Sequence, residues 1–122
     1  MDRIFYIEQK TGYSDDGPAW IGFVKQSRNG KTIYFNGKAF RKSGRGSHYD
    51  IETGEVYWIS GVKKSGRDGW GDSKPKVWIE QAAVSHYLKL RGLSTLSNRF
   101  KVFVPIKTPI EKFRKIDNER SA

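Results

Sequence analysis

The amino-acid sequence predicts a mainly β (α+β) domain: a small antiparallel barrel or strongly bent sheet of five to seven short strands, with one helix at about residues 80–91. Apolar residues recur in short runs broken by Gly, Asn, Asp and Ser, which is typical of strands joined by turns. Only one segment shows clear helical periodicity. The length of 122 residues fits one domain, which we place at residues 1–104.

The first half of the chain is expected to form hairpins. Residues 3–9 are dense in β-branched and aromatic side chains, and residues 19–26 form a second strand after a turn-rich loop. Asn29-Gly30 predicts a tight turn, because both residues accept a positive φ. The strand that follows this turn should therefore pair with residues 19–26. It continues to Lys42 beyond a second turn or bulge at Asn36-Gly37.

The second half begins with another hairpin. Residues 49–51 and 56–59 are strand-like and flank a turn in which Gly54 is expected to be left-handed. A long loop rich in Gly, Lys and Ser then occupies residues 61–75. A short strand at residues 76–79 leads into the predicted helix.

The helix is predicted from its apolar spacing and its end signal. Val84, Tyr87 and Leu88 fall on one stripe, and Gly92 follows basic residues as expected for a helix C-terminus. A last strand is expected at residues 100–104. Residues 105–122 form a basic C-terminal extension, which we predict to be a short helix or a partly ordered tail.

The composition supplies a core and excludes several function classes. Aromatic residues are plentiful, with 4 Trp, 6 Tyr and 7 Phe, and there are no cysteines, which excludes disulfides and thiolate metal sites. The apolar run at the N-terminus stops at Glu8, and no stretch has the length of a membrane span. We therefore expect a cytoplasmic protein. The expected core comprises Phe5, Ile7, Trp20, Ile21, Phe23, Ile33, Phe35, Tyr57, Ile59, Val77, Ile79, Val84 and Leu88.

No catalytic motif is recognisable, so we expect a protein that is not an enzyme and holds no cofactor or metal. The only histidines are His48 and His86, and neither has the spacing of a metal-binding pair. A general base at His48 would need a carboxylate such as Asp50 facing it, which we consider the weaker interpretation. Neither a phosphate-binding loop nor a nucleophile elbow occurs.

The charge distribution is the most informative functional signal. The chain carries a net charge of +10, an excess that favours anionic partners. Residues 25–45 contain seven basic residues and no acid, and residues 63–76 contain five basic residues and two acids. Aromatic side chains are interleaved with these cations, a combination that suits nucleic acid, because cations follow phosphates and rings stack on bases.

We predict a nucleic-acid-binding module, for DNA or RNA, in which both basic segments converge on one strip. Stacking is expected from Tyr34 and Trp70. A module that docks an acidic protein is the alternative, and a solvated basic surface without a ligand is a third interpretation. The expected phosphate contacts are Lys31, Lys38, Arg41, Lys42, Arg45, Lys63, Lys64 and Arg67.

Three stretches resemble a family of short, uncharacterised bacterial proteins. They are the residues 7–22, with Lys10-Thr11-Gly12-Tyr13, the run KTIYFNGKAF at 31–40, and YDIETGEVYWISGVKK at 49–64. The resemblance covers most of residues 4–96. Some members carry the name 1-deoxy-D-xylulose-5-phosphate synthase, a thiamine-diphosphate enzyme. That name does not fit this chain, since the Gly-Asp-Gly motif of such a cofactor site is missing here. The resemblance implies a bacterial, cytoplasmic, stand-alone domain.

Overall fold

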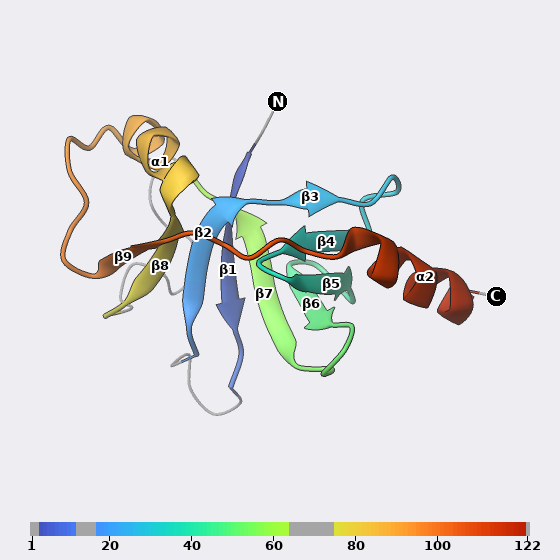
Figure 1. The fold of residues 1–122 in the computed structure, drawn as a ribbon. Helices are drawn as coiled ribbons and strands as arrows, with labels where there is room; N and C mark the ends of the chain where they lie inside the picture. Colours follow the sequence, from blue (N-terminus) through green and yellow to red (C-terminus); the bar gives the residue numbers. More distant parts are fainter. Residues whose placement is uncertain (1–2, 12–16, 64–74, 122) are drawn as a thin grey trace.

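A curled, half-barrel sheet forms the centre of the protein, and two short helices pack on it (Figure 1). The structure is a computed structural model that describes residues 3–11, 17–63 and 75–121. Within these residues the strands are β1 (Ile4–Gln9), β2 (Ala19–Phe23), β3 (Lys25–Gln26), β4 (Thr32–Phe35), β5 (Lys38–Lys42), β6 (Ser47–Asp50), β7 (Val56–Gly61), β8 (Val77–Glu80) and β9 (Phe100–Phe103). The helices are α1 (Val84–Arg91), preceded by a 3₁₀ turn at Gln81–Ala83, and α2 (Ile110–Ser121). The predicted mainly β fold is confirmed.

The sheet curls because one bent segment contributes to both of its halves. The strand order is β3-β4-β5-β6-β7-β1-β2-β8-β9. Only Val24 separates β2 from β3, yet β2 pairs with β1 whereas β3 pairs with β4. Since the two strands are nearly continuous in the chain, the sheet must turn back on itself. This break is one reason why nine strands are found in the described part instead of the five to seven predicted.

Two of the strand pairs are parallel, which differs from the predicted antiparallel sheet. β8 pairs in parallel with β2 and with β9. For the β8–β9 pair the reason lies in the connection, because the 3₁₀ turn and α1 stand between the two strands, and a helical crossover returns the chain in the same direction. The predicted helix at 80–91 is therefore confirmed, and it ends at Gly92, whose φ is +66°.

The alternation of side chains along the strands produces three apolar clusters. Ile7, Phe35 and Tyr57 belong to the cluster of β1, β4, β5 and β7, with Trp20 packed against it. A second cluster joins β1, β2 and β8 to Tyr87 of α1. The third lies between the β4–β5 hairpin and α2. Within the predicted core, Phe5, Trp20, Phe23, Val84 and Leu88 are only partly buried, whereas buried Ile4, Tyr6, Tyr34, Phe40, Tyr87 and Phe113 were not anticipated.

The two Asn-Gly pairs form different turns. Asn36 and Gly37 both have a positive φ, +50° and +79°, so the tight two-residue turn lies between β4 and β5. At the other pair only Gly30 has a positive φ. The side chain of Asn29 instead accepts a hydrogen bond from the backbone N–H of Lys31 (3.0 Å), which stabilises a longer turn. Gly54 is left-handed at +77°, as predicted.

The C-terminal segment packs on the same sheet. Residues 105–109, which we call the strap, lead from β9 past the β4–β5 turn to α2 (Figure 1). Two hydrogen bonds fix the strap to that turn: Ile106 N–H donates to Asn36 Oδ1 (3.0 Å), and Gly37 N–H donates to Thr108 Oγ1 (2.9 Å). Beyond the strap, Phe113 of α2 is fully buried against Tyr34, Ala39 and Ile51. No helix in the described ranges is both long and apolar enough to cross a bilayer.

Candidate functional site

Four exposed cations gather where two neighbouring turns meet. The backbone N–H of Lys42, at the end of β5, donates to the carbonyl of Lys31, just before β4 (2.9 Å). Because Thr32 and Arg41 are register partners, Lys31 and Lys42 stand opposite each other on adjacent strands. Arg28 lies in the β3–β4 turn and Arg45 in the β5–β6 turn. We call Arg28, Lys31, Lys42 and Arg45 the basic end.

The positive charges of the basic end repel one another, so they do not stabilise the fold. All four side chains are exposed, and none forms an ion pair with another residue of the part that the structure describes. Like charges directly opposite each other on paired strands repel. An anion that bridges Lys31 and Lys42 would remove this repulsion. The arrangement is therefore suited to holding phosphate groups.

The buried side chain of His48 lies next to the basic end. It is the register partner of Lys42, only 5% of its surface is exposed, and its Nδ1–H donates to the carbonyl of Gly46 (3.1 Å). Burial lowers the pKa of His48; the hydrogen bond to Gly46 opposes this shift in part, and the nearby charge of Lys42 adds to it. The neutral ring thus holds the turn that carries Arg45.

We expect this burial to make stability depend on pH. The folded-state pKa of His48 lies below the unfolded value of about 6.5. Between the two values the unfolded chain binds more protons, so the free energy of unfolding should fall as the pH is lowered through that window, by at most about 1.4 kcal/mol per pH unit. The free energy of unfolding, measured with urea at pH 7.5, 6.5 and 5.5, should depend less on pH in His48→Gln than in wild type. The matched control is His86→Gln, which replaces an exposed histidine and should leave the pH dependence of the free energy of unfolding as in wild type. The same pH dependence in both variants would contradict the assignment of the effect to His48.

The carboxylate of Asp50, two residues from His48 in the chain, already has hydrogen-bond partners. The buried carboxylate of Asp50 accepts from Lys38 Nζ (3.2 Å) through Oδ2 and from the backbone N–H groups of Glu52 (2.8 Å) and Thr53 (3.3 Å) through Oδ1. These contacts close the β6–β7 turn. Asp50 therefore has a structural role.

The other buried acids are also held by neighbours. Tyr6 donates its hydroxyl hydrogen to Glu8 (2.6 Å), and Lys10 Nζ lies 3.1 Å from the same carboxylate. Burial raises the pKa of Glu80, which lies on β8. Among the described residues, no three His, Asp or Glu side chains come together as they would around a metal ion.

The structure brings together only some of the residues that were predicted to contact phosphates. Lys31, Lys42 and Arg45 belong to the basic end. Lys38 lies at the opposite end of β5 and pairs with Asp50, so its charge is largely compensated. Arg41 is half-buried and, as the chain neighbour of Lys42, points to the other face of the sheet. Arg28 was not in the predicted set; its place beside the Asn29-Gly30 turn is the signal that could have indicated it.

The predicted role of Tyr34 in stacking is wrong for this structure. Only 4% of its surface is exposed, because α2 covers the outer face of β4 and places Phe113 against the ring. Residues 105–122 were predicted to be a short helix or a partly ordered tail without a docking position, so this cover was not anticipated. No base could reach the Tyr34 ring while α2 is docked.

The second basic segment is described only in part. Lys63 is exposed and follows the end of β7, whose last residue, Gly61, is the register partner of Phe5 near the start of β1. The predicted convergence of the two basic segments on one strip therefore stays a prediction. Lys64, Arg67 and Trp70 lie outside the described residues.

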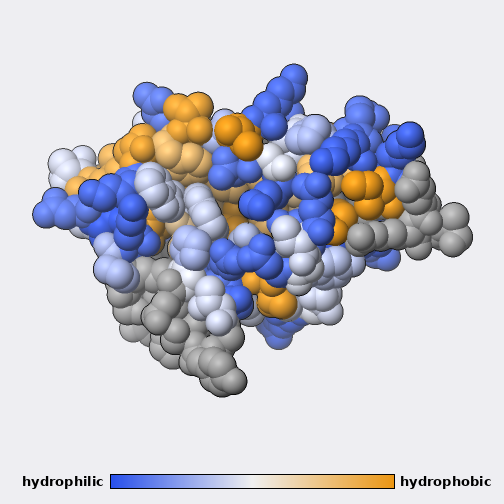
Figure 2. Space-filling view, turned by 60° about the horizontal axis from the view of Figure 1, so that its bottom comes forward, coloured by the Kyte–Doolittle hydropathy of each residue, from blue (hydrophilic) through white to orange (hydrophobic). Residues whose placement is uncertain are grey.

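A second group of cations and rings lies on β8 and β9, at the other end of the strand order. Lys76 Nζ is 4.3 Å from the ring centroid of half-buried Trp78, and Lys101 is the register partner of that residue. In Figure 2, hydrophilic side chains (blue) on the face shown form several groups, with apolar side chains (orange) between them. The polar surface of this face is therefore distributed over several places.

Comparison with known proteins does not identify a relative: the chain matches no family model, no curated protein and no solved structure. The resemblance to short bacterial proteins remains an expectation.

Proposed function

We propose that this protein is a non-enzymatic module that binds nucleic acid through phosphate contacts at the basic end. One observation carries the proposal: Lys31 and Lys42 face each other across paired strands with no acid to compensate them in the described structure. Arg28 and Arg45 extend the same positive surface on both sides. A polyanion with regularly spaced phosphates complements such a group of cations.

The absence of an exposed ring among the described residues of the basic end suggests that bases are not read there. Phosphate contacts position a protein on nucleic acid without recognising sequence. We therefore expect little sequence preference and similar binding to DNA and RNA. The affinity should depend strongly on salt, because each neutralised phosphate releases counterions.

The test is fluorescence anisotropy with a labelled 20-nucleotide strand and the matching duplex at 50–200 mM salt. If about four phosphates are contacted, the slope of log K against log salt should be about −3.6 for the duplex and about −2.8 for the single strand. The variant R28A/K31A/K42A/R45A should bind at least about 100-fold more weakly at 50 mM salt and show a slope near zero.

A charge-matched control separates position from net charge. The variant K76A/K89A/K101A/K115A loses the same four positive charges from exposed positions outside the basic end. It should retain most of the wild-type affinity. Equal losses in both variants, or no binding of wild type at 50 mM salt, would refute the proposed site.

The second candidate function is a module that docks an acidic protein, and a different observation favours its protein-docking part. Val102 in β9, Val104 between β9 and the strap, and Ile106 in the strap occupy alternate positions and expose 52%, 73% and 68% of their surface. Exposed apolar residues in a row are typical of protein contact surfaces. Apolar contacts do not weaken with salt as phosphate contacts do. Binding of an acidic protein that persists at 200 mM salt and is lost in V104D/I106D would favour this candidate.

A further inference from the structure

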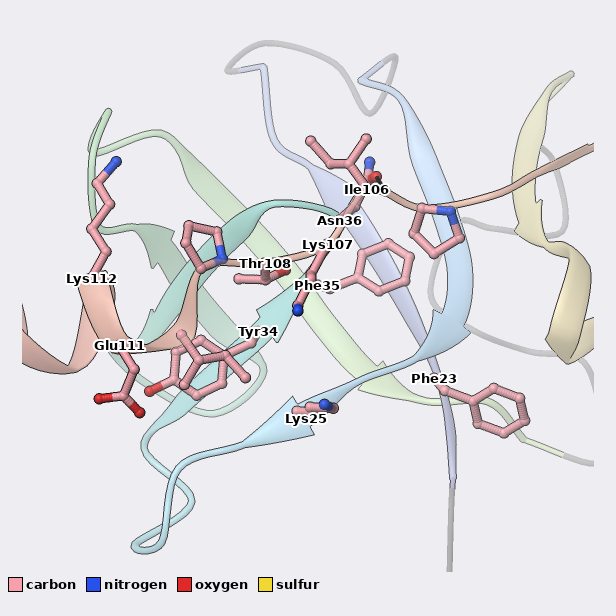
Figure 3. A pocket seen from close by; sticks show the side chains of 13 residues that line it. Phe23, Lys25, Tyr34, Phe35, Asn36, Ile106, Lys107, Thr108, Glu111 and Lys112 are labelled. Atoms are coloured by element: carbon pink, nitrogen blue, oxygen red, sulfur yellow. Dashed lines mark hydrogen bonds between the residues drawn. The ribbon is translucent and has the colours of Figure 1, made fainter.

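The strap leaves a groove between itself and strands β3 and β4 (Figure 3). Its volume is about 520 Å³. Phe23, Lys25 and Phe35 line it from the sheet side, and Pro105, Lys107 and Ile110 line it from the strap and α2. The volume lies in the range of small-molecule sites, about 300–1,000 Å³.

The walls of this groove are held in place independently of any ligand. The two hydrogen bonds between the strap and Asn36-Gly37 fix one edge. Phe103, just before the strap, packs edge-to-face on Phe35 with ring centroids 6.2 Å apart. Gly37 allows the close approach, because a Cβ at this position would lie 2.5 Å from Ile106 Cδ1. The groove is therefore part of the folded structure.

The lining combines apolar surface with uncompensated positive charge. Aromatic, proline and isoleucine side chains form most of it. Lys25 and Lys107 are both exposed and have no ion-pair partner in the described residues, and Figure 3 shows Lys107 extending from the strap toward β3, the strand of Lys25. The other charges are compensated: Lys112 pairs with Glu52 (3.0 Å), and Glu111 pairs with Arg114 (2.8 Å).

We propose that this groove binds a small amphipathic anion. Its apolar body, of about 10–20 non-hydrogen atoms, would lie against Phe35 and the prolines of the strap. One anionic head group, a carboxylate, sulfonate or phosphate, would lie between Lys25 and Lys107. A nucleic-acid base fits this lining less well, since Asn36 and Thr108 already use polar side-chain atoms to hold the strap. The inference does not depend on phosphate binding at the basic end.

Two fluorescent probes that share an apolar body test the proposal. 8-Anilinonaphthalene-1-sulfonate carries the anionic group, and N-phenyl-1-naphthylamine lacks it. We expect the sulfonate to bind at least about tenfold more tightly than the neutral probe, which is the effect of one good charge-assisted contact. In K25Q/K107Q this preference should disappear. The control K89Q/K115Q, with the same loss of charge away from the groove, should keep it.

Amide chemical shifts locate the bound sulfonate probe. Residues of the strap and of β4 should shift in wild type and not in K25Q/K107Q. An unchanged preference in that variant, or shifts confined to α1 or to another surface, would overturn the inference. Binding that persists in R28A/K31A/K42A/R45A separates this site from the basic end, so either proposal can fail without the other.

Discussion

Phe113→Ala is expected to lower the free energy of unfolding by about 3–5 kcal/mol, the usual cost of truncating a fully buried phenylalanine. The side chain is completely buried between α2 and the hairpin of β4 and β5. Its removal leaves a cavity against Tyr34 and weakens the main apolar contact of α2 with the sheet. Urea unfolding followed by tryptophan fluorescence measures the change.

Ile116→Ala is the matched control for this prediction. Ile116 lies one turn further along α2 and is only partly buried, so its truncation should cost clearly less. A loss below about 1 kcal/mol for Phe113→Ala would mean that α2 does not dock as described. In that case Tyr34 would be accessible, and its predicted stacking role would have to be reconsidered.

Asp50→Ala is expected to have the second-largest effect, a loss of about 2–4 kcal/mol. The substitution leaves the backbone N–H groups of Glu52 and Thr53 without their acceptor in the β6–β7 turn. It also removes the partner of Lys38, which costs less, because that side chain is 41% exposed and can be solvated by water.

Asp50→Asn separates these two contributions. The amide retains an oxygen that can accept from the turn but carries no charge for Lys38. We expect it to recover more than half of the stability lost in Asp50→Ala. If both variants were equally unstable, the ion pair with Lys38 would be the dominant interaction. Affinity for oligonucleotide should be unchanged in folded Asp50→Asn, since the basic end is not altered.

These predictions connect the fold to the two proposed sites. α2 and the strap cover the outer face of the β4–β5 hairpin, and the same hairpin carries Lys31 and Lys42 at its open end. Loss of α2 docking should therefore abolish the groove that binds the amphipathic probe before it affects phosphate contacts. Probe binding and oligonucleotide binding measured on Phe113→Ala would distinguish the two sites.

Local sequence determined the elements of this protein. Alternating apolar residues predicted the strands, the spacing of Val84, Tyr87 and Leu88 predicted α1, and Gly54 and Gly92 marked positions with positive φ. These features depend on interactions within a few residues, so the printed order of amino acids is enough to recognise them. The high content of Lys and Arg likewise predicted a basic surface, because charge is additive along a chain.

The tertiary structure alone decided which residues meet. The bend at Val24 curls the sheet, and strand register then places Lys31 opposite Lys42 while Arg41 points to the other face. The docking of α2 buries Tyr34, a residue that looks accessible in a basic, strand-like run. Burial and pairing across the sheet arise from contacts between residues distant in sequence, and the free energy of those contacts is set by the whole fold and not by any local pattern.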